Sequence, residues 1–448
     1  MQSMTTISQH AAALRDGQST SLAIVEAALE RLQAPAGEGL RAFTRVYADT
    51  ARAAARASDA LRVAGLSRSA IDGLPVSIKD LFDVAGETTL AGSIVRLGEA
   101  VASEHAAIVK RLLAAGAVII GRTNMTEFAY SGLGLNPHYG TPLNAWDRKT
   151  GRIPGGSSSG AAVSVSDGMA VAGIGTDTGG SIRIPAALCG LVGFKPTARR
   201  VPTAGALPLS INLDSIGPIA PTVSCCACLD AILAGEEVLP LVPARLRGLR
   251  LAVPTTLALD HLDAQVAAAF AAALASLSAA GALIDEIPLP ALAKLAGINA
   301  KGGFTAAEAW AWHRDLIARA ADRYDPRVVS RILRGKDMSA ADLLDVLNAR
   351  PRWIAEVEAD LAGFDALLMP TTPIIAPPVA ELAASDENYA RANALMLRNP
   401  SIINFLDGCA LSMPCHAAGS APVGLMVCGP AMHDKRILAI GVAIEAVV

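Results

Sequence analysis

Helix-like segments alternate with short apolar runs along this chain, and that alternation limits the folds available to it. Helical periodicity marks residues 4–34, with Ser21 as a candidate N-cap, and residues 50–66, 105–115, 161–172, 266–284 and much of 300–362. Short runs of apolar residues, typical of buried strands, occupy 74–78, 117–120, 249–254, 366–369 and 421–428. Such an order predicts an α/β fold.

The composition is that of a folded protein with a large core. Hydrophobic residues make up 52% of the 448 residues, charged residues make up 18%, and the formal net charge is -3. This balance argues against disorder and gives no sign of a nucleic-acid partner or of binding to an anionic membrane. It fits a small substrate that is neutral or mildly anionic.

Two segments could direct a chain like this to a membrane, and neither has the required pattern. Residues 1–19 lack a basic region followed by an apolar core, so they do not form a secretory signal. Residues 266–284 are mostly alanine, and Phe270, Leu274 and Leu277 recur at helical spacing, which favours a packed amphipathic helix. We therefore expect a cytoplasmic protein.

Three of the seven cysteines, Cys225, Cys226 and Cys228, lie in one short segment. Tetrahedral metal sites usually draw on spaced pairs of ligands from two parts of a chain, so this cluster is a poor candidate for a metal site. The segment is better explained as the first turns of a helix that follows Pro221 and Thr222. We expect reduced cysteines, no metal and no other cofactor.

Between residues 130 and 160 the periodicity disappears, and Gly, Pro, Asn and Ser become frequent. An irregular stretch of this length inside a compact domain is usually functional. It ends in a first glycine–serine run, GGSSSG at 155–160, and a second run, GIGTDTGGS, follows at 173–181. The second run is expected to be rich in turns.

A glycine run that ends in serine suits acyl transfer. Glycine permits positive φ, and successive N–H groups can then surround a phosphate or the oxyanion of acyl transfer. Ser181, at the end of the second run, would place a hydroxyl beside those N–H groups. The hydroxyl needs a base to become a good nucleophile, and none of the seven histidines lies in either run.

Lys79 is the candidate base, because it closes the apolar run at 74–78. Burial disfavours the ammonium form of a lysine, and the neutral amine can accept a proton. One alternative is a structural lysine paired with Asp80 or Asp83. A second alternative is that both glycine runs are merely loops.

Two other motifs are matched in part. Residues 156–160 fit the GxSxG nucleophile elbow, but Pro154 is poorly suited to the strand that must precede it. The elbow also leaves the second glycine run unexplained. Residues 173–175 begin like a dinucleotide-binding fingerprint, but Thr178 stands where the third glycine is required, and the preceding segment is helix-like.

The stretch RIPGGSSSGAAVSVSDGMAVAGIGTDTGGSIRIPAALCGLVGFKPT, residues 152–197, closely resembles the signature of the amidase-signature family of serine hydrolases. The flanking segments agree with that family. They are LPVSIKD at 74–80, which resembles its lysine motif, GRTNMTEFA at 121–129, MPTTPIIAPP at 369–378 and PVGLMV at 422–427. The similarity covers nearly the whole chain and is weakest at 230–360.

The resemblance also implies an architecture. It implies a single domain over 1–448, built on a large mixed β-sheet with helices on both faces. A signature core would occupy about 70–235, and a more variable helical region on the substrate side would occupy about 285–360.

The same resemblance implies a role for each site residue. Ser181 would be the nucleophile, Ser157 a bridging serine that follows a cis peptide bond, and Lys79 the general base. The oxyanion hole would be formed by backbone N–H groups of Thr178, Gly179, Gly180 and Ser181. Ser158 and Asp177 would hold the loops, and so would Arg183, for which a structural role is preferred to a contact with an anionic substrate.

The substrate pocket is expected from two parts of the chain. One is residues 126–140, with Phe128, Tyr130 and Gly132, and the other is residues 300–360, with Phe304, Trp310 and Trp312. For the aromatic residues, packing in the core is the commoner role. Members of the family cleave aliphatic and aryl amides, anilides, carbamates and ureas, so the substrate is not fixed by the resemblance.

The resulting expectation is an amidase that hydrolyses the C–N bond of small amides through an acyl-enzyme. Its partners would be a small amide and water, with no nucleic acid and no membrane, and a homodimer is compatible with it. One alternative is the glutaminase subunit of a tRNA-dependent amidotransferase. The other is a catalytically silent anion-binding protein on the same fold.

Overall fold

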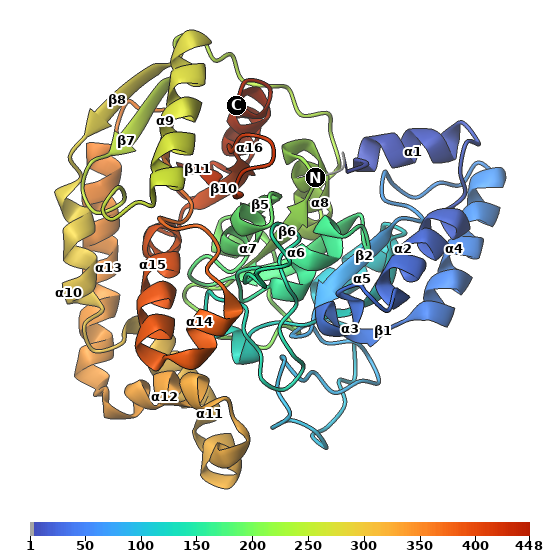
Figure 1. The fold of residues 1–448 in the computed structure, drawn as a ribbon, viewed down its shortest axis with the longest axis horizontal. Coiled ribbons are helices and arrows are strands. Elements are labelled where there is room, and N and C mark those ends of the chain that lie inside the picture. Colours follow the sequence, from blue (N-terminus) through green and yellow to red (C-terminus); the bar gives the residue numbers. More distant parts are fainter. Residues whose placement is uncertain (1–3) are drawn as a thin grey trace.

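The computed structural model describes residues 4–448, which form one 11-stranded mixed sheet with helices on both faces (Figure 1). The strands are β1 Phe43–Val46, β2 Pro75–Lys79, β3 Val118–Thr123, β4 Ala172–Asp177, β5 Val192–Lys195, β6 Ser215–Ala220, β7 Arg250–Pro254, β8 Leu283–Ile287, β9 Ala366–Pro370, β10 Cys409–Pro414 and β11 Gly424–Gly429. Their order across the sheet is β1-β3-β2-β4-β6-β5-β10-β11-β9-β7-β8. The expected α/β architecture with a large mixed sheet is confirmed.

The helices vary in length from single turns to five turns or more. They are α1 Ile7–Arg15, α2 Ser21–Gln33, α3 Gly39–Ala42, α4 Ala48–Val63, α5 Ala107–Ala114, α6 Ser159–Ser166, α7 Arg183–Leu188, α8 Val223–Ala234, α9 Ala264–Ala279, α10 Leu295–Ile298, α11 Gly303–Ala320, α12 Pro326–Leu333, α13 Ala340–Asp360, α14 Val379–Ala384, α15 Asp386–Phe405 and α16 Asp434–Glu445. Among the helices of residues 4–448, none is long and apolar enough to cross a membrane.

Side chains that alternate along the central strands divide the core between the two faces of the sheet. On β2, Val76 and Ile78 pack into the largest apolar cluster, which also contains residues of α5, α8, α9 and α16. Ser77 and Lys79 point to the opposite face, where the Ser77 hydroxyl lies 2.8 Å from that of Ser164 in α6. The alternation of side chains along β2 therefore places its polar residues on the face of the sheet that α6 and α7 cover.

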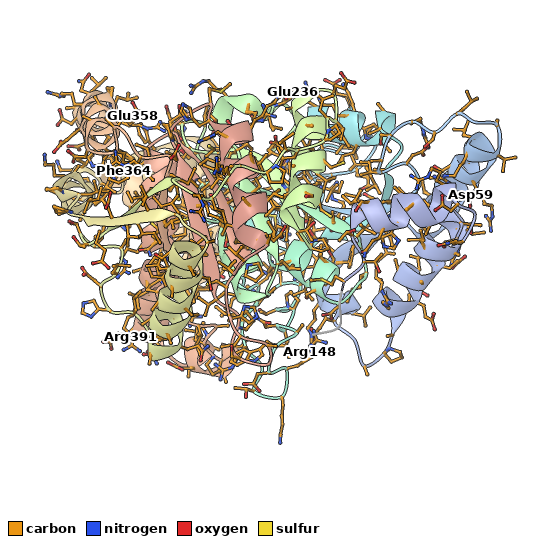
Figure 2. The ribbon with its side chains drawn as sticks, turned by 90° about the horizontal axis from the view of Figure 1, so that it is seen from above. Asp59, Arg148, Glu236, Glu358, Phe364 and Arg391 are labelled. Atoms are coloured by element: carbon orange, nitrogen blue, oxygen red, sulfur yellow. The ribbon has the colours of Figure 1, made fainter. Side chains whose placement is uncertain are left out.

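The sheet determines the long dimension of the molecule. Asp59 of α4 lies near one end and Glu358 of α13 near the other, with the strands between them (Figure 2). Helices α2 and α4 cover the end at β3, and α13 lies on the side of β7 and β8 (Figure 1). Helices α11 and α12 pack against each other at the bottom of this view, below α14 and α15. The glycine–serine runs lie in the middle of the sheet, between these two ends.

Several expected boundaries were wrong. The second glycine run is not all turns, because Ala172–Asp177 forms the fully buried strand β4. The alanine-rich helix ends at Ala279, and Leu283 and Ile284 belong to the separate strand β8. The N-cap of α2 is Thr20, whose hydroxyl accepts the Ala23 N–H, and the predicted helix at 4–34 is two helices. The cysteine-rich segment does begin a helix, with Thr222 as its N-cap.

Candidate active site

Lys79 is the last residue of β2, a strand that lies between β3 and β4 and pairs in parallel with both. Its side chain has no exposed surface. In sheets with parallel strands, ligand sites lie beyond the carboxyl ends of the strands. The end of β2 at Lys79 and the end of β4 at Asp177 are therefore the places where a site is expected, and both glycine–serine runs meet there.

Two hydroxyl groups surround the Lys79 amine. Lys79 Nζ lies 2.7 Å from Ser157 Oγ and 2.8 Å from Thr176 Oγ1. Burial lowers the pKa of Lys79 from 10.5 to about 7, although the charges of Asp214 and Asp177 oppose the shift. A lysine whose pKa lies near neutrality can take the uncharged form, which accepts a proton.

The alternative of a structurally paired lysine is not supported. Asp80 instead forms a buried ion pair with Arg122, with 2.6 Å between Asp80 Oδ1 and Arg122 Nε. Asp83 accepts a hydrogen bond from the Thr89 hydroxyl. In the part of the chain that the structure describes, no carboxylate lies within ion-pair distance of Lys79, so its partners are the two hydroxyls.

The first glycine–serine run passes close to neighbouring backbone. A Cβ at Gly156 would lie 2.5 Å from the Gly134 nitrogen, which excludes any larger residue. The peptide bond between Gly156 and Ser157 is cis, as the family resemblance implied. The Ser157 carbonyl accepts the N–H of Thr126 (3.1 Å), so this loop is held on the side of residues 126–134 as well.

Ser158 connects the first run to the second. Its N–H donates to the Ser181 carbonyl (3.3 Å), and its hydroxyl lies 3.4 Å from the Thr176 carbonyl. These contacts are those expected of a residue that holds the loops together. They place the peptide that follows Ser157 directly against Ser181.

The second run turns sharply between β4 and α7. Gly180 has φ 124°, and a Cβ there would lie 2.6 Å from Pro400 Cβ. Asp177 closes the turn, because its carboxylate accepts the N–H groups of Gly180 (2.8 Å) and Ile182 (3.2 Å).

The expected set of backbone N–H groups in the oxyanion hole was therefore wrong at one position, Gly180. The Gly180 N–H is bonded to Asp177 and is not free to meet a substrate oxygen. The backbone N–H groups of Thr178, Gly179 and Ser181 have no acceptor among residues 4–448. These three N–H groups are the available donors at the turn.

Arg183 and Asp177 form a buried ion pair beneath the turn. Arg183 Nη2 lies 2.8 Å from Asp177 Oδ1, and both side chains have no exposed surface. The same guanidinium donates to Asn404 Oδ1 (2.6 Å) and to the Pro400 carbonyl (3.0 Å). Burial alone would raise the pKa of Asp177, but the Arg183 charge and hydrogen bonds outweigh it and hold that pKa well below its usual range. These contacts favour the structural role for Arg183.

A cavity of about 380 Å³ opens beside Ser181. The turn contributes Thr178, Gly179 and Ser181 to its lining. The other lining residues are Ala129, Tyr130, Ser131, Leu209, Leu213, Leu257, Leu295, Ala296, Asn299, Gly302, Thr305, Arg331, Leu397, Arg398, Ser401, Asn404 and Phe405. The walls are thus mainly apolar, and the polar groups of the turn lie on one side.

Of the side chains named above as substrate-binding candidates, Tyr130 lines this cavity. The two expected stretches also contribute Ala129 and Ser131, and Gly302, Thr305 and Arg331. Phe128 instead packs against His313 and Tyr324, with ring centroids 4.4 and 5.3 Å away, and is 1% exposed. Phe128 has a positive φ of 49° in a tight turn, and its N–H donates to the Ala91 carbonyl. Gly132 packs against Ile184 and Leu397 and does not line the cavity.

The expected aromatic residues of 300–360 are also absent from the lining of this cavity. Phe304 is buried against Phe405, and Trp310 packs on the main core. Trp312 is 37% exposed and contacts the His313 ring edge-on, with ring centroids 4.4 Å apart. Packing, the commoner role for such residues, is what the structure shows for Phe304 and Trp310.

Sequence reasoning missed three polar residues of the site. Thr176 lies in β4, two residues before the turn begins at Thr178. Its hydroxyl accepts a hydrogen bond from Lys79 Nζ, as that of Ser157 does. Asp214 accepts a hydrogen bond from the Thr178 hydroxyl. Asn404 donates to Asp177 from helix α15, far away in the sequence. The position of Thr176 in the strand could have been found from period-two alternation, whereas the other two depend on tertiary contacts.

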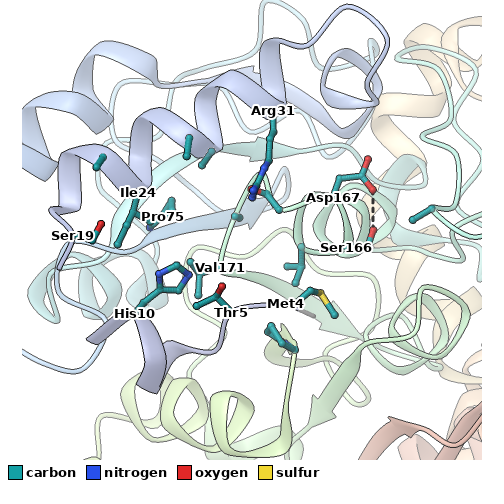
Figure 3. A pocket seen from close by; sticks show the side chains of 18 of the residues that line it. Met4, Thr5, His10, Ser19, Ile24, Arg31, Pro75, Ser166, Asp167 and Val171 are labelled. Carbon is teal, nitrogen blue, oxygen red and sulfur yellow. Dashed lines mark hydrogen bonds between the residues drawn. The ribbon is translucent and has the colours of Figure 1, made fainter. Parts of the chain in front are cut away.

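A larger cavity of about 760 Å³ lies at the opposite ends of the same strands (Figure 3). Pro75, at the start of β2, and Val171, just before β4, line it, together with His10 and Arg31. Lys79 and Asp177 lie at the other ends of these strands. The volume is greater here, but the clustered hydroxyl, amine and N–H groups described above are elsewhere.

Comparison with known proteins assigns the chain to a family. A family model described as Amidase matches residues 23–438. The chain belongs to the amidase family. It is 37% identical over 445 residues to 2-amino-5-chloromuconic acid deaminase of Comamonas testosteroni, with 99% of this chain and 96% of that protein covered.

Two further members of the amidase family illustrate the range of its relatives. A glutamyl-tRNA(Gln) amidotransferase subunit of Chloroflexus aggregans is 33% identical over 477 residues, covering 99% of this chain and 96% of that one. A crystal structure of an amidase superposes with a TM-score of 0.89 at 34% identity and covers 99% of both chains. As an amidase-family enzyme, the protein acts on carbon–nitrogen bonds other than peptide bonds.

Proposed function

We propose that the protein hydrolyses small amides through an acyl-enzyme on Ser181, with Ser157 and Lys79 as a proton relay. The observation that carries this proposal is the fully buried Lys79 amine, 2.7 Å from the Ser157 hydroxyl, with a pKa lowered to about 7 by burial. A serine hydroxyl needs such a base before it can attack a carbonyl.

The proton would move in single file. As Ser181 Oγ attacks the amide carbon, its proton passes to Ser157 Oγ, and the Ser157 proton passes to Lys79 Nζ. The tetrahedral intermediate then expels the amine, which needs a proton because an amide anion is a very poor leaving group. The same relay returns the proton from Lys79 through Ser157 to the leaving nitrogen. Water then attacks the ester by the same route and releases the acid and free Ser181.

The oxyanion of the intermediate would bind to the free N–H groups of the turn. Those of Thr178, Gly179 and Ser181 have no acceptor among the described residues, 4–448, and they adjoin the cavity. Each such donor is worth about 10²–10³ in rate in related acyl-transfer sites, because it meets charge that develops only in the transition state. The buried Asp177–Arg183 pair fixes the turn that presents them.

We further propose that the substrate carries a carboxylate. Arg331 of α12 lines the cavity with its guanidinium carbon 4.7 Å from the centre of the Tyr130 ring. No carboxylate in residues 4–448 lies within ion-pair distance of it. An unpaired guanidinium beside apolar walls recognises carboxylates well. The name of the Comamonas relative also specifies an acid as substrate.

The glutaminase component of an amidotransferase is the second candidate. The 33% identity to the Chloroflexus protein over nearly the whole chain favours it. Glutamine is itself a small amide with a carboxylate, so both candidates share the proposed chemistry. Release of ammonia from free glutamine at rates above those of all other amides would favour the second candidate.

A substrate panel tests the proposal. The purified enzyme would be assayed for amine or ammonia release from primary amides, anilides and carbamates, each with and without a carboxylate. We expect turnover by the wild type, with preference for the carboxylated member of a pair, and none by Ser181→Ala. Equal turnover by wild type and Ser181→Ala would refute the proposed function.

A further inference from the structure

The carboxylate of Asp214 connects two parts of the site that are distant in sequence. Its Oδ1 accepts the hydroxyl of Thr178, the first residue of the turn that carries the free N–H groups. Its Oδ2 accepts the N–H groups of Leu209 (2.9 Å) and Ser210 (3.1 Å). One carboxylate therefore binds the turn with one oxygen and the loop before β6 with the other.

That loop is a wall of the cavity. Leu209 and Leu213 line the cavity together with Thr178 and Ser181. The loop is closed by hydrogen bonds from the N–H groups of Leu213 (3.1 Å) and Asp214 (2.8 Å) to the Ser210 carbonyl. Since Asp214 holds both, the distance between the apolar wall and the N–H donors depends on its carboxylate.

A second connection runs through the backbone beside it. Ser215, the next residue, begins β6 opposite Asp177 of β4, and its hydroxyl donates to the Asp177 carbonyl (3.0 Å). Asp214 is thus anchored at the end of a paired strand. Its side chain has a fixed origin from which to hold Thr178.

We propose that Asp214 is a positioning residue that aligns the N–H donors at Thr178–Ser181 with the apolar wall of the cavity. This inference rests on the proposed function and adds a residue to it. Asp214 does not itself line the cavity, so it acts through Thr178 and Leu209, which do.

The charged groups around Asp214 determine the sign of the electrostatic effect. They are Lys79 from β2, Asp177 from β4 and Glu308 from α11. Burial raises the pKa of Asp214 to about 6, and its hydrogen bonds from Thr178, Ser210 and Leu209 oppose the rise. The Asp214 charge in turn raises the pKa of Lys79. Removing the charge should therefore lower the pKa of Lys79 and extend its action as a base to lower pH.

The test measures the second-order rate at which a fluorophosphonate labels Ser181, from pH 5 to pH 9, which needs no knowledge of the natural substrate. The first variant is Asp214→Asn, which removes the charge and replaces one acceptor oxygen with an NH2 group. The second is Thr178→Val, which removes only the hydroxyl that donates to Asp214. Thr178→Ser restores the donor. Asp285→Asn, an exposed carboxylate on β8, is the matched control.

In a plot of labelling rate against pH, we expect Asp214→Asn to reduce the plateau rate at least about tenfold. We also expect the rising part of that plot, its rising limb, to move to lower pH. Thr178→Val should reduce the plateau similarly while its limb moves less, because the carboxylate remains, and Thr178→Ser should recover most of the lost rate. Asp285→Asn should match the wild type. A purely structural role would leave the position of the limb unchanged.

Other results would overturn the inference. If Asp214→Asn reacts at the wild-type rate with an unmoved limb, Asp214 positions nothing. If Asp214→Asn fails to fold, a wild-type rate in Thr178→Val overturns the inference by itself. If the wild type is not labelled at Ser181 at all, the proposed function fails first, and that result is distinct from the other two.

Discussion

Lys79 donates to the hydroxyl of Ser157 across 2.7 Å in a position where neither side chain is exposed. A charged ammonium at such a place has lost its hydration, and burial accordingly lowers the pKa of Lys79 to about 7. Thr176 provides the second polar neighbour, at 2.8 Å. This contact is the one that the proposed proton relay requires.

Activity should depend on the uncharged form of Lys79. The neutral fraction rises with pH, so the rate of acyl-enzyme formation should rise through about pH 7 and fall about tenfold for each unit below that value. Lys79→Met should lower the rate at least about 10²-fold at all pH values, and its rate should no longer rise through pH 7. The measurement is the pH profile of turnover of a responsive amide; a limb near pH 10 in the wild type would contradict the assignment.

The two serines should fail differently. Ser181→Ala removes the nucleophile and should abolish both turnover and covalent labelling. Ser157→Ala leaves Ser181 in place but interrupts its path to Lys79, so slow labelling should persist at a rate lower by about 10²–10⁴. Intact-protein mass spectrometry over time distinguishes the two. Rapid labelling of Ser157→Ala would show that Ser157 carries no proton.

The pair of Arg183 and Asp177 should matter for stability. Arg183→Gln leaves a buried carboxylate without its partner, and breaking a pair in this way costs about 3–5 kcal/mol of unfolding free energy. Arg250→Gln is a matched control, since its pair with Asp285 is about half exposed and solvent screening limits its worth to at most about 1 kcal/mol. Urea titrations of both variants provide the comparison. Equal losses would contradict the structural role of Arg183.

Arg331 should separate substrates by charge. Arg331→Met should raise KM for amides that carry a carboxylate by about tenfold or more and change KM little for neutral amides of the same size. The neutral amides act as the internal control. A similar change for both classes would mean that Arg331 shapes the cavity without reading charge.

The sequence could predict which segments meet at the end of β2, because their signals are local. Two glycine–serine runs and one lysine at the end of an apolar strand each have a physical signature within a few residues, and the structure places Lys79 against Ser157 and Ser158 against Ser181. The alternation of β2 also explains why Lys79 lies on the α6 face. The mixed sheet was expected from the family resemblance and is confirmed by the structure.

The surroundings of the site were harder to predict because they depend on tertiary contacts. The cavity takes lining residues from α15, such as Leu397 and Ser401, which carry no local signal. The ring of Phe128 was expected in the pocket, but a turn with positive φ places it in an aromatic cluster. The Gly180 N–H was expected to be free, and the neighbouring carboxylate of Asp177 occupies it.

Titration of Lys79 by NMR, in protein labelled with ¹³C at the lysine ε-carbons, measures the protonation of the proposed base itself. The Lys79 signal would be assigned by its loss in Lys79→Met. We expect a titration near pH 7, far below the ordinary 10.5. A signal that titrates near 10.5 would show a lysine that remains charged at neutral pH, and it could not serve as the base.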